Sequence, residues 1–183
     1  MRSALLALLL CVPSIVDARP LTFGAGVGRL QAERDYDGQA DSTVQLFGRL
    51  GLTSRVGGQL ELQKIEGGYN ATVRTVTALI VVEMGQSGHL VPLMFAGLGV
   101  DHATSPSGYT QEDGSPIEGG FGLEYRFDGG LSLTADVRLG GRSVDQSDTV
   151  VLDAGGGGAL AVYAPLLIEG EYKSARIGLS IRL

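Results

Sequence analysis

Apolar and polar residues alternate along most of the chain beyond residue 20, with the period of two that places successive side chains on opposite faces of a β-strand. In LTFGAGVG (21–28), the odd positions hold Leu, Phe, Ala and Val, and the even positions hold Thr and Gly. Similar runs occur at 43–52, 56–63, 120–127, 131–139 and 175–183, and two less regular ones, 71–84 and 90–101, complete eight predicted strands. The pattern predicts a single all-β domain.

The connections between these runs alternate in length. Short connections lie at 53–55, 85–88 and 128–130, an intermediate one lies at 67–70, and long ones lie at 31–42, 102–116 and 143–171. Short periplasmic turns, longer extracellular loops and an outward apolar band are typical of transmembrane β-barrels. Because lipid offers no hydrogen-bond partner to an open sheet edge, we predict a closed antiparallel eight-stranded up-and-down transmembrane β-barrel.

The glycines of residues 21–30 step by two, and Arg29 stands where a dinucleotide-binding fingerprint needs its last glycine. A phosphate loop is therefore not predicted. The interior of an eight-stranded barrel is just wide enough for side chains to fill it. We expect glycines on the face opposite the apolar rows to make room for larger inward side chains; they are Gly24, Gly26, Gly28, Gly97, Gly99, Gly120, Gly122 and Gly178.

The first 18 residues carry a positive charge at Arg2, an apolar stretch at 4–12 and a small-residue cleavage pattern ending at Ala18. We predict a signal peptide at 1–18 and a barrel domain at 19–183. Cys11 is the single cysteine, so the mature chain would have neither disulfides nor a thiol nucleophile. The formal net charge of −6 argues against nucleic acid as a partner. No metal or organic cofactor is predicted.

These features together resemble the small outer-membrane β-barrel family of the OmpA membrane domain and OmpX, porin-family proteins of Gram-negative bacteria. The resemblance rests on the leader, the ordered alternating segments and the strand FAGLGV (95–100) before a long loop. It implies an outer-membrane location, insertion by the barrel assembly machinery and a monomer. One departure concerns the last residue, because such chains usually finish on an aromatic residue and this one finishes on Leu183.

The same alternation predicts that charges of both signs face the barrel interior. We expect them to form a paired polar network that blocks conduction, because a buried ion is tolerated only beside a partner. The candidate network residues are Glu61, Arg74, Glu124, Arg126, Asp136, Arg138 and Arg176. The run 72–82 is apolar on both faces toward its end, so the register that places Arg74 inward could be reversed.

Outward cations are few and fall at strand ends beside the longer loops. Arg29, Lys64 and Lys173 are our candidates for contacts with lipopolysaccharide phosphates, with a plain solvated rim as the alternative. The longer loops are acidic, which favours solvated, mutually repelling segments over a calcium site. The resulting hypothesis is an outer-membrane barrel with a structural or surface-interaction role and no open pore.

Two other functions stay open. A lipid-modifying outer-membrane enzyme would need a histidine beside a serine and an acid, and His89 and His102 are the only histidines. We expect both to be surface histidines, and we predict no catalytic residue. A soluble periplasmic eight-stranded ligand-binding barrel would have the inverted polarity, with the apolar face lining a cavity. The apolar segment 150–168 could extend the last strands, enter the lumen or form a hairpin that makes ten strands; we favour the first.

Overall fold

The computed structural model describes residues 20–32, 40–66, 72–85, 88–104, 111–144, 167 and 169–183. The predicted signal peptide, 1–18, lies outside these residues. Eight strands account for most of the described chain: β1 (Leu21–Ala32), β2 (Asp41–Gly51), β3 (Val56–Glu66), β4 (Thr72–Glu83), β5 (Leu90–Thr104), β6 (Gln111–Arg126), β7 (Leu131–Val144) and β8 (Gly170–Arg182). In these ranges no helix is long and apolar enough to cross a membrane.

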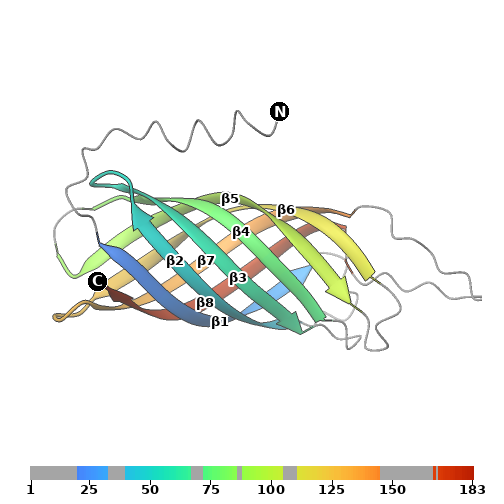
Figure 1. The fold of residues 1–183 in the computed structure, drawn as a ribbon, viewed down its shortest axis with the longest axis horizontal. Coiled ribbons are helices and arrows are strands. Elements are labelled where there is room, and N and C mark those ends of the chain that lie inside the picture. Colours follow the sequence, from blue (N-terminus) through green and yellow to red (C-terminus); the bar gives the residue numbers. More distant parts are fainter. Residues whose placement is uncertain are drawn as a thin grey trace, which may run out of the picture.

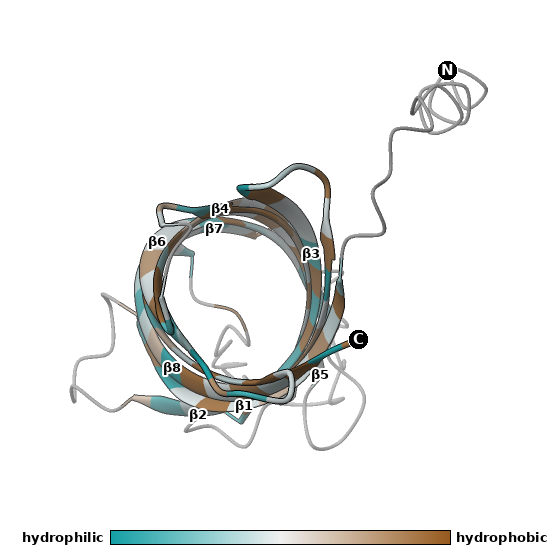
Figure 2. Ribbon diagram, turned by 90° about the vertical axis from the view of Figure 1, so that its left-hand side faces the viewer, coloured by the Kyte–Doolittle hydropathy of each residue, from teal (hydrophilic) through white to brown (hydrophobic). Residues whose placement is uncertain are grey.

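Each strand pairs with the next, and β8 pairs with β1 to close an antiparallel barrel. Figure 1 shows the tilted strands, and Figure 2 shows the closed ring viewed along the barrel. The prediction of an eight-stranded barrel is confirmed. β7 and β8 pair directly, from Leu131 with Ile181 to Arg142 with Gly170, so the described chain has no additional hairpin between them.

The two ends of the barrel differ. The short turns at 52–55 and 127–130, and residues 84, 85, 88 and 89 of the β4–β5 connection, lie at the end where β1 begins and β8 finishes. We call this the turn end and the opposite one the loop end (Figure 1). β5 and β6 run further toward the loop end than predicted, with Thr104 paired to Gln111. His102, Glu112 and Asp113 therefore lie on strands, although the sequence pattern placed them in a loop.

The outer surface is apolar around the whole ring. Leu139, Leu98 and Ile117 expose 69%, 66% and 66% of their surface, and every strand contributes exposed large hydrophobic side chains. Soluble monomers rarely show apolar patches of more than a few hundred Å², whereas hydrocarbon solvates such a surface. The polarity is thus that of a transmembrane barrel and is opposite to that of a soluble carrier.

Glycines on the inner face leave room for their larger neighbours, as predicted. A Cβ added to Gly28 would meet the Arg176 Cγ at 2.6 Å, and one on Gly120 would meet the Arg138 Cγ at 2.8 Å. The Gly24 position abuts the Phe47 ring in the same way. Inward arginines and aromatic rings therefore fill the space that glycines on neighbouring strands leave open.

The prediction that Arg74 faces the interior is wrong. On β4 the inward positions are the buried residues Val73, Thr75 and Thr77, and Arg74 lies exposed on the outer face. The later half of β4 is apolar on both faces because its inward residues pack in an apolar cluster on the inner wall, formed by Leu79, Val81, Val91, Leu93 and Phe95. Because the inward residues of this half are apolar like the outward ones, the sequence pattern did not show which residues of β4 face inward.

Candidate functional site: an internal ion-pair network and an outer rim of cations

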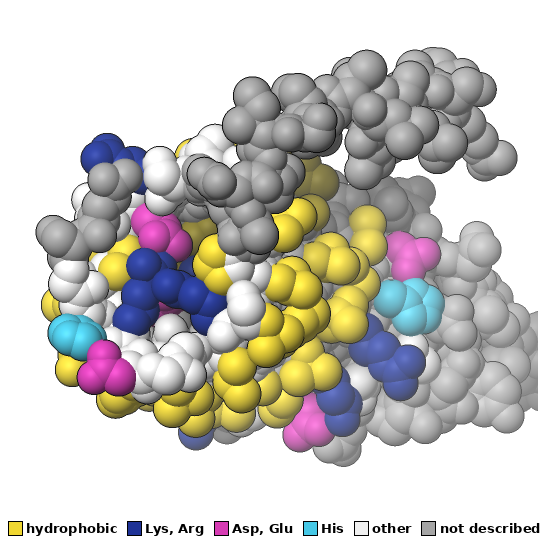
Figure 3. Space-filling view, turned by 60° about the vertical axis from the view of Figure 1, so that its left-hand side comes forward, with side chains coloured by type: hydrophobic (Ala, Val, Ile, Leu, Met, Phe, Trp, Pro, Cys, Tyr) yellow, Lys and Arg dark blue, Asp and Glu magenta, His cyan; other side chains and the backbone are white. Residues whose placement is uncertain are grey.

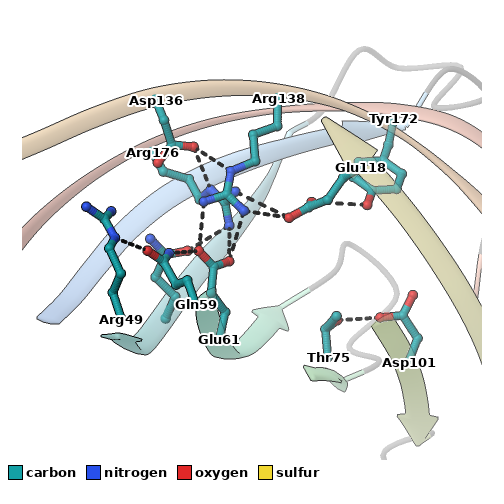
Figure 4. Close-up of polar contacts among 11 residues, drawn as sticks. Arg49, Gln59, Glu61, Thr75, Asp101, Glu118, Asp136, Arg138, Tyr172 and Arg176 are labelled. Carbon is teal, nitrogen blue, oxygen red and sulfur yellow. Dashed lines mark hydrogen bonds and ion pairs between the residues drawn. The ribbon is translucent and has the colours of Figure 1, made fainter. Parts of the chain in front are cut away.

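The centre of the barrel holds two arginines and three carboxylates, shown in Figure 4. Arg138 lies 2.7 Å from Glu61 (Nη2 to Oε1), 2.6 Å from Glu118 (Nη1 to Oε1) and 2.9 Å from Asp136 (Nε to Oδ1). Arg176 lies 3.0 Å from Glu61 and 3.1 Å from Asp136. Arg176 also lies 3.6 Å from Glu118 (Nη2 to Oε1), so both guanidinium groups contact all three carboxylates, which joins the five side chains into one cluster.

The central cluster is almost inaccessible to solvent. The Arg138 side chain is 0% exposed, and its three carboxylate partners are at most 6% exposed. The Arg138 guanidinium also lies over the Phe95 ring, 4.5 Å from its centroid, which adds a cation–π contact. Ions without water must have partners, because removing one member of a buried pair leaves an uncompensated charge. The cluster therefore holds strands β3, β6, β7 and β8 together across the lumen.

A second cluster lies toward the turn end and is centred on Glu124. The Glu124 carboxylate accepts hydrogen bonds from Arg49 at 2.8 Å and Arg126 at 2.6 Å. Arg182 approaches it at 3.3 Å, and Arg126 also pairs with Glu83 at 2.7 Å. This cluster contains more guanidinium groups than carboxylates, unlike the central one.

Gln59 joins the turn-end cluster to the centre. Its side-chain oxygen accepts a hydrogen bond of 2.6 Å from the Nε of Arg49, and its amide nitrogen donates one of 2.6 Å to Glu61. An amide can serve both neighbours because it carries a donor and an acceptor. The polar contacts thus run without interruption from the turn end to the central arginines.

The loop end of the interior changes from polar to apolar. Asp101 accepts hydrogen bonds from Thr75 and Arg142, and the Tyr172 hydroxyl lies 3.3 Å from Glu118. Beyond these groups lies an apolar layer, which we call the mouth layer; it comprises Leu30, Ile65, Val73, Ala103, Leu167 and Tyr172.

Leu167 is the described residue of the long β7–β8 connection that enters this layer. Its side chain is 2% exposed, and its backbone N–H donates a hydrogen bond of 2.7 Å to the Glu112 carboxylate. The expected extension of the last strands through 150–168 is not seen at Leu167, which lies in a bend and is buried in the mouth layer. The rest of that segment lies outside the described residues.

Six of the seven candidate network residues lie in these internal clusters: Glu61, Glu124, Arg126, Asp136, Arg138 and Arg176. Arg74, on the outer face, does not. Sequence reasoning missed Glu83 and Glu112 as internal groups. Glu83 is the last residue of β4, where the register was ambiguous, and Glu112 was assigned to a loop because the start of β6 has no apolar alternation.

The outward cations gather at the loop end in two groups. Arg29 on β1 and Lys173 on β8 lie on paired strands, where their Cα partners are Ala175 and Gln31. Lys64 on β3 is directly paired with Arg74 on β4, and both are exposed. Lys64 also forms a 2.8 Å ion pair with Glu66. In the described part of the chain, no hydrogen bond or ion pair engages the Arg74 guanidinium.

The two histidines lie at opposite ends. The Nδ1 of His89 is 2.8 Å from the Arg126 carbonyl oxygen, and that of His102 is 2.7 Å from the Asp113 carboxylate. Among the described residues, neither ring is hydrogen-bonded to a serine or threonine hydroxyl. The described ranges also contain no cluster of three or more His, Cys, Asp or Glu side chains that could hold a metal ion.

No protein-family model matches the chain, and no curated protein is similar to it in sequence. Solved structures are similar in fold. Neisserial surface protein A superposes with a TM-score of 0.64 at 9% identity, covering 89% of this chain and 97% of that one. A major outer membrane protein of Thermus thermophilus gives 0.58 at 12% identity, covering 91% and 100%. The N-terminal β-barrel domain of Pseudomonas aeruginosa OprF gives 0.57 at 18% identity, covering 90% and 98%.

These superpositions show a shared fold. The chain has the architecture of the small eight-stranded outer-membrane barrels, which agrees with a location in the outer membrane of the cell and with the family resemblance seen in the sequence.

Proposed function

We propose that this chain is an integral outer-membrane protein that is closed to ions and has a structural or surface-interaction role. The observation that carries this proposal is the central cluster, in which the Arg138 side chain is 0% exposed and contacts three carboxylates. An ion crossing the lumen would have to separate these pairs in a space without bulk water, and breaking one buried pair costs about 3 to 5 kcal/mol.

The other layers of the interior support closure. The turn-end cluster lies on one side of the central arginines, and the apolar mouth layer lies on the other. Leu167 and Ala103 in that layer are 2% and 0% exposed, so these two described side chains are packed out of contact with solvent. A porin of 16 to 18 strands leaves an aqueous channel because its interior is wider than side chains can fill.

Conductance across a planar lipid bilayer tests the proposal. We expect the folded wild-type barrel to show no stable unitary conductance. Removing the central cations with Arg138→Ala and Arg176→Ala should produce openings, because the space they fill becomes available to water. Arg74→Ala is the matched control, since it removes an arginine that lies outside the lumen. Stable channels in the wild-type protein would refute closure.

The outward cations support a further part of the proposal, namely contacts with lipopolysaccharide phosphates, with the loop end facing out of the cell. The Lys64–Arg74 pair is informative because like charges directly opposite each other destabilise a sheet. An anionic group between them would relieve that repulsion. Arg74 is therefore added to Arg29, Lys64 and Lys173 as a proposed contact. Insertion by the barrel assembly machinery and a monomeric state belong to the same proposal.

A lipid-modifying enzyme is the second candidate, and the His102–Asp113 contact is the observation that favours it. A carboxylate bonded to Nδ1 leaves the other ring nitrogen free to act as a base. The described residues supply no nucleophile bonded to that ring. Incubating the folded protein with acyl-labelled lipopolysaccharide or phospholipid distinguishes the candidates: acyl release that is lost in His102→Ala would establish the enzyme, and no release would leave the structural role.

A further inference from the structure

The lumen opens at the turn end into a cavity of about 210 Å³, which we call the turn-end vestibule. Its charged lining consists of Arg49, Arg55, Glu83, Arg126 and Arg182. Figure 3 looks toward this end and shows Lys and Arg side chains gathered inside the mouth of the barrel, with acidic side chains beside them. The cavity is separate from the central cluster and from the outward cations at the loop end.

The vestibule has an excess of positive charge. Four guanidinium groups line it, and their described partners are the carboxylates of Glu83 and Glu124. Asp128, the acid of the neighbouring turn, forms no ion pair with a described residue. The central cluster is different, because there the carboxylates outnumber the guanidinium groups.

Two of the four arginines have guanidinium N–H donors without a partner among the described residues. In the described part of the chain, the Arg55 guanidinium makes no hydrogen bond or ion pair, although a backbone bond of 2.7 Å from Glu83 N–H to the Arg55 carbonyl holds its turn beside the mouth. Arg182 has one contact, at 3.3 Å to Glu124, and its side chain is 31% exposed. A guanidinium carries five N–H donors, so both can engage a further anionic partner.

We propose that the turn-end vestibule binds a small dianion bearing a phosphate group, either inorganic phosphate or a phosphate monoester. Two negative charges match the excess of two guanidinium groups. Arginine suits this ligand because its planar donors engage phosphate oxygens in pairs. The volume is sufficient, since at about 30 Å³ per liquid water the cavity has room for roughly seven waters. Arg55 and Arg182 would provide the new contacts, while Arg49 and Arg126 stay with Glu124.

This site does not depend on whether the barrel is closed or on what its loops contact. In an outer-membrane barrel with the loop end outside, the vestibule faces the periplasm, where inorganic phosphate and soluble phosphate monoesters are two sources of the same dianionic group. Inorganic phosphate and glycerol phosphate are therefore the two probes, and sulfate, a tetrahedral dianion without a titrating proton, is the reference anion.

Isothermal titration calorimetry on the full barrel, folded in a zwitterionic detergent, tests the proposal. We expect saturable binding of inorganic phosphate or glycerol phosphate to the wild type. Arg55→Gln with Arg182→Gln should weaken binding by about tenfold or more, since the loss of a single charged hydrogen bond is already worth about one decade. Tighter binding of glycerol phosphate would assign the site to phosphate monoesters, and equal or tighter binding of inorganic phosphate would assign it to the free ion.

The matched control adds Glu169→Gln and Glu171→Gln, two exposed acids at the loop end, to the double arginine variant, which restores its net charge. Binding should stay weak in this variant, because the loop end is independent of the vestibule. Recovery of wild-type binding, or no saturation in the wild type, would overturn the proposal in favour of general electrostatic attraction. Arg55→Gln alone covers the case in which the double variant does not fold, since the Arg55 side chain supports no internal contact among the described residues.

Discussion

Gly120 lies beside Arg138 in the β6–β7 pair, and the missing side chain of the glycine is what lets the arginine cross the barrel. A Cβ at position 120 would come within 2.8 Å of both the Cα and the Cγ of Arg138. The inward glycines are thus spatial complements of the arginines that close the lumen.

Replacing Gly120 by alanine should destabilise the barrel. The added methyl group meets backbone atoms of β7, which cannot move aside, and overpacking of this kind costs about 1 to 3 kcal/mol. Denaturant unfolding in lipid vesicles, followed by heat-modifiable gel migration, measures the change. Gly141→Ala is the control, because a Cβ there points into open space; equal losses in both variants would show that the crowding at Gly120 is unimportant.

Removing the Arg138 guanidinium should be more damaging than any change at the surface. Arg138→Met leaves Glu61, Glu118 and Asp136 with Arg176 as their one described cation in the cluster, and we expect a loss of about 3 to 5 kcal/mol in unfolding free energy. Adding Glu118→Gln should recover part of this loss by restoring charge balance, which a double-mutant cycle measures. Additive effects would contradict a coupled network.

Charge reversal on the outer rim should reduce the lipopolysaccharide that purifies with the barrel. The variant carries Glu in place of Arg29, Lys64, Arg74 and Lys173, and the bound lipopolysaccharide per mole of folded protein is the readout. The expected loss follows from repulsion between the new carboxylates and the lipid phosphates. Arg55→Glu, at the turn end, is the control. Unchanged lipopolysaccharide in the fourfold variant would count against the contacts.

Truncating Leu167 should weaken the mouth layer. Its side chain is buried among Ile65, Val73 and Tyr172, and a Leu→Ala change in a packed core costs about 2 to 5 kcal/mol. Thermal unfolding of the vesicle-embedded protein measures the shift. Leu52→Ala, in an exposed turn, should shift the midpoint much less. Indistinguishable midpoints would show that the Leu167 contact contributes little to stability.

Conductance, phosphate binding and acyl release are tested separately from these stability predictions. A barrel that unfolds more easily can still be closed, and a closed barrel can still bind an anion in its vestibule. The outcomes are therefore independent of one another.

The sequence by itself determined the number of strands, the closure of the sheet and which face meets lipid. A residue on a strand points in or out by parity alone, so the alternation in 131–139 sufficed to place Asp136 and Arg138 in the lumen. The same argument failed at Arg74. The run that follows it is apolar on both faces, so the alternation of apolar and polar residues does not show which face points inward.

Only the tertiary structure decided which charges meet. Glu61 and Arg138 are 77 residues apart in sequence, and Arg49 and Glu124 are 75 apart. Their contacts depend on strand tilt and on the register between strands, neither of which leaves a local trace in the residue pattern. The turn-end vestibule arises for the same reason: closing the ring brings arginines from β2, β6, β8 and the β2–β3 turn to one mouth, and their excess over carboxylates exists only once the barrel has formed.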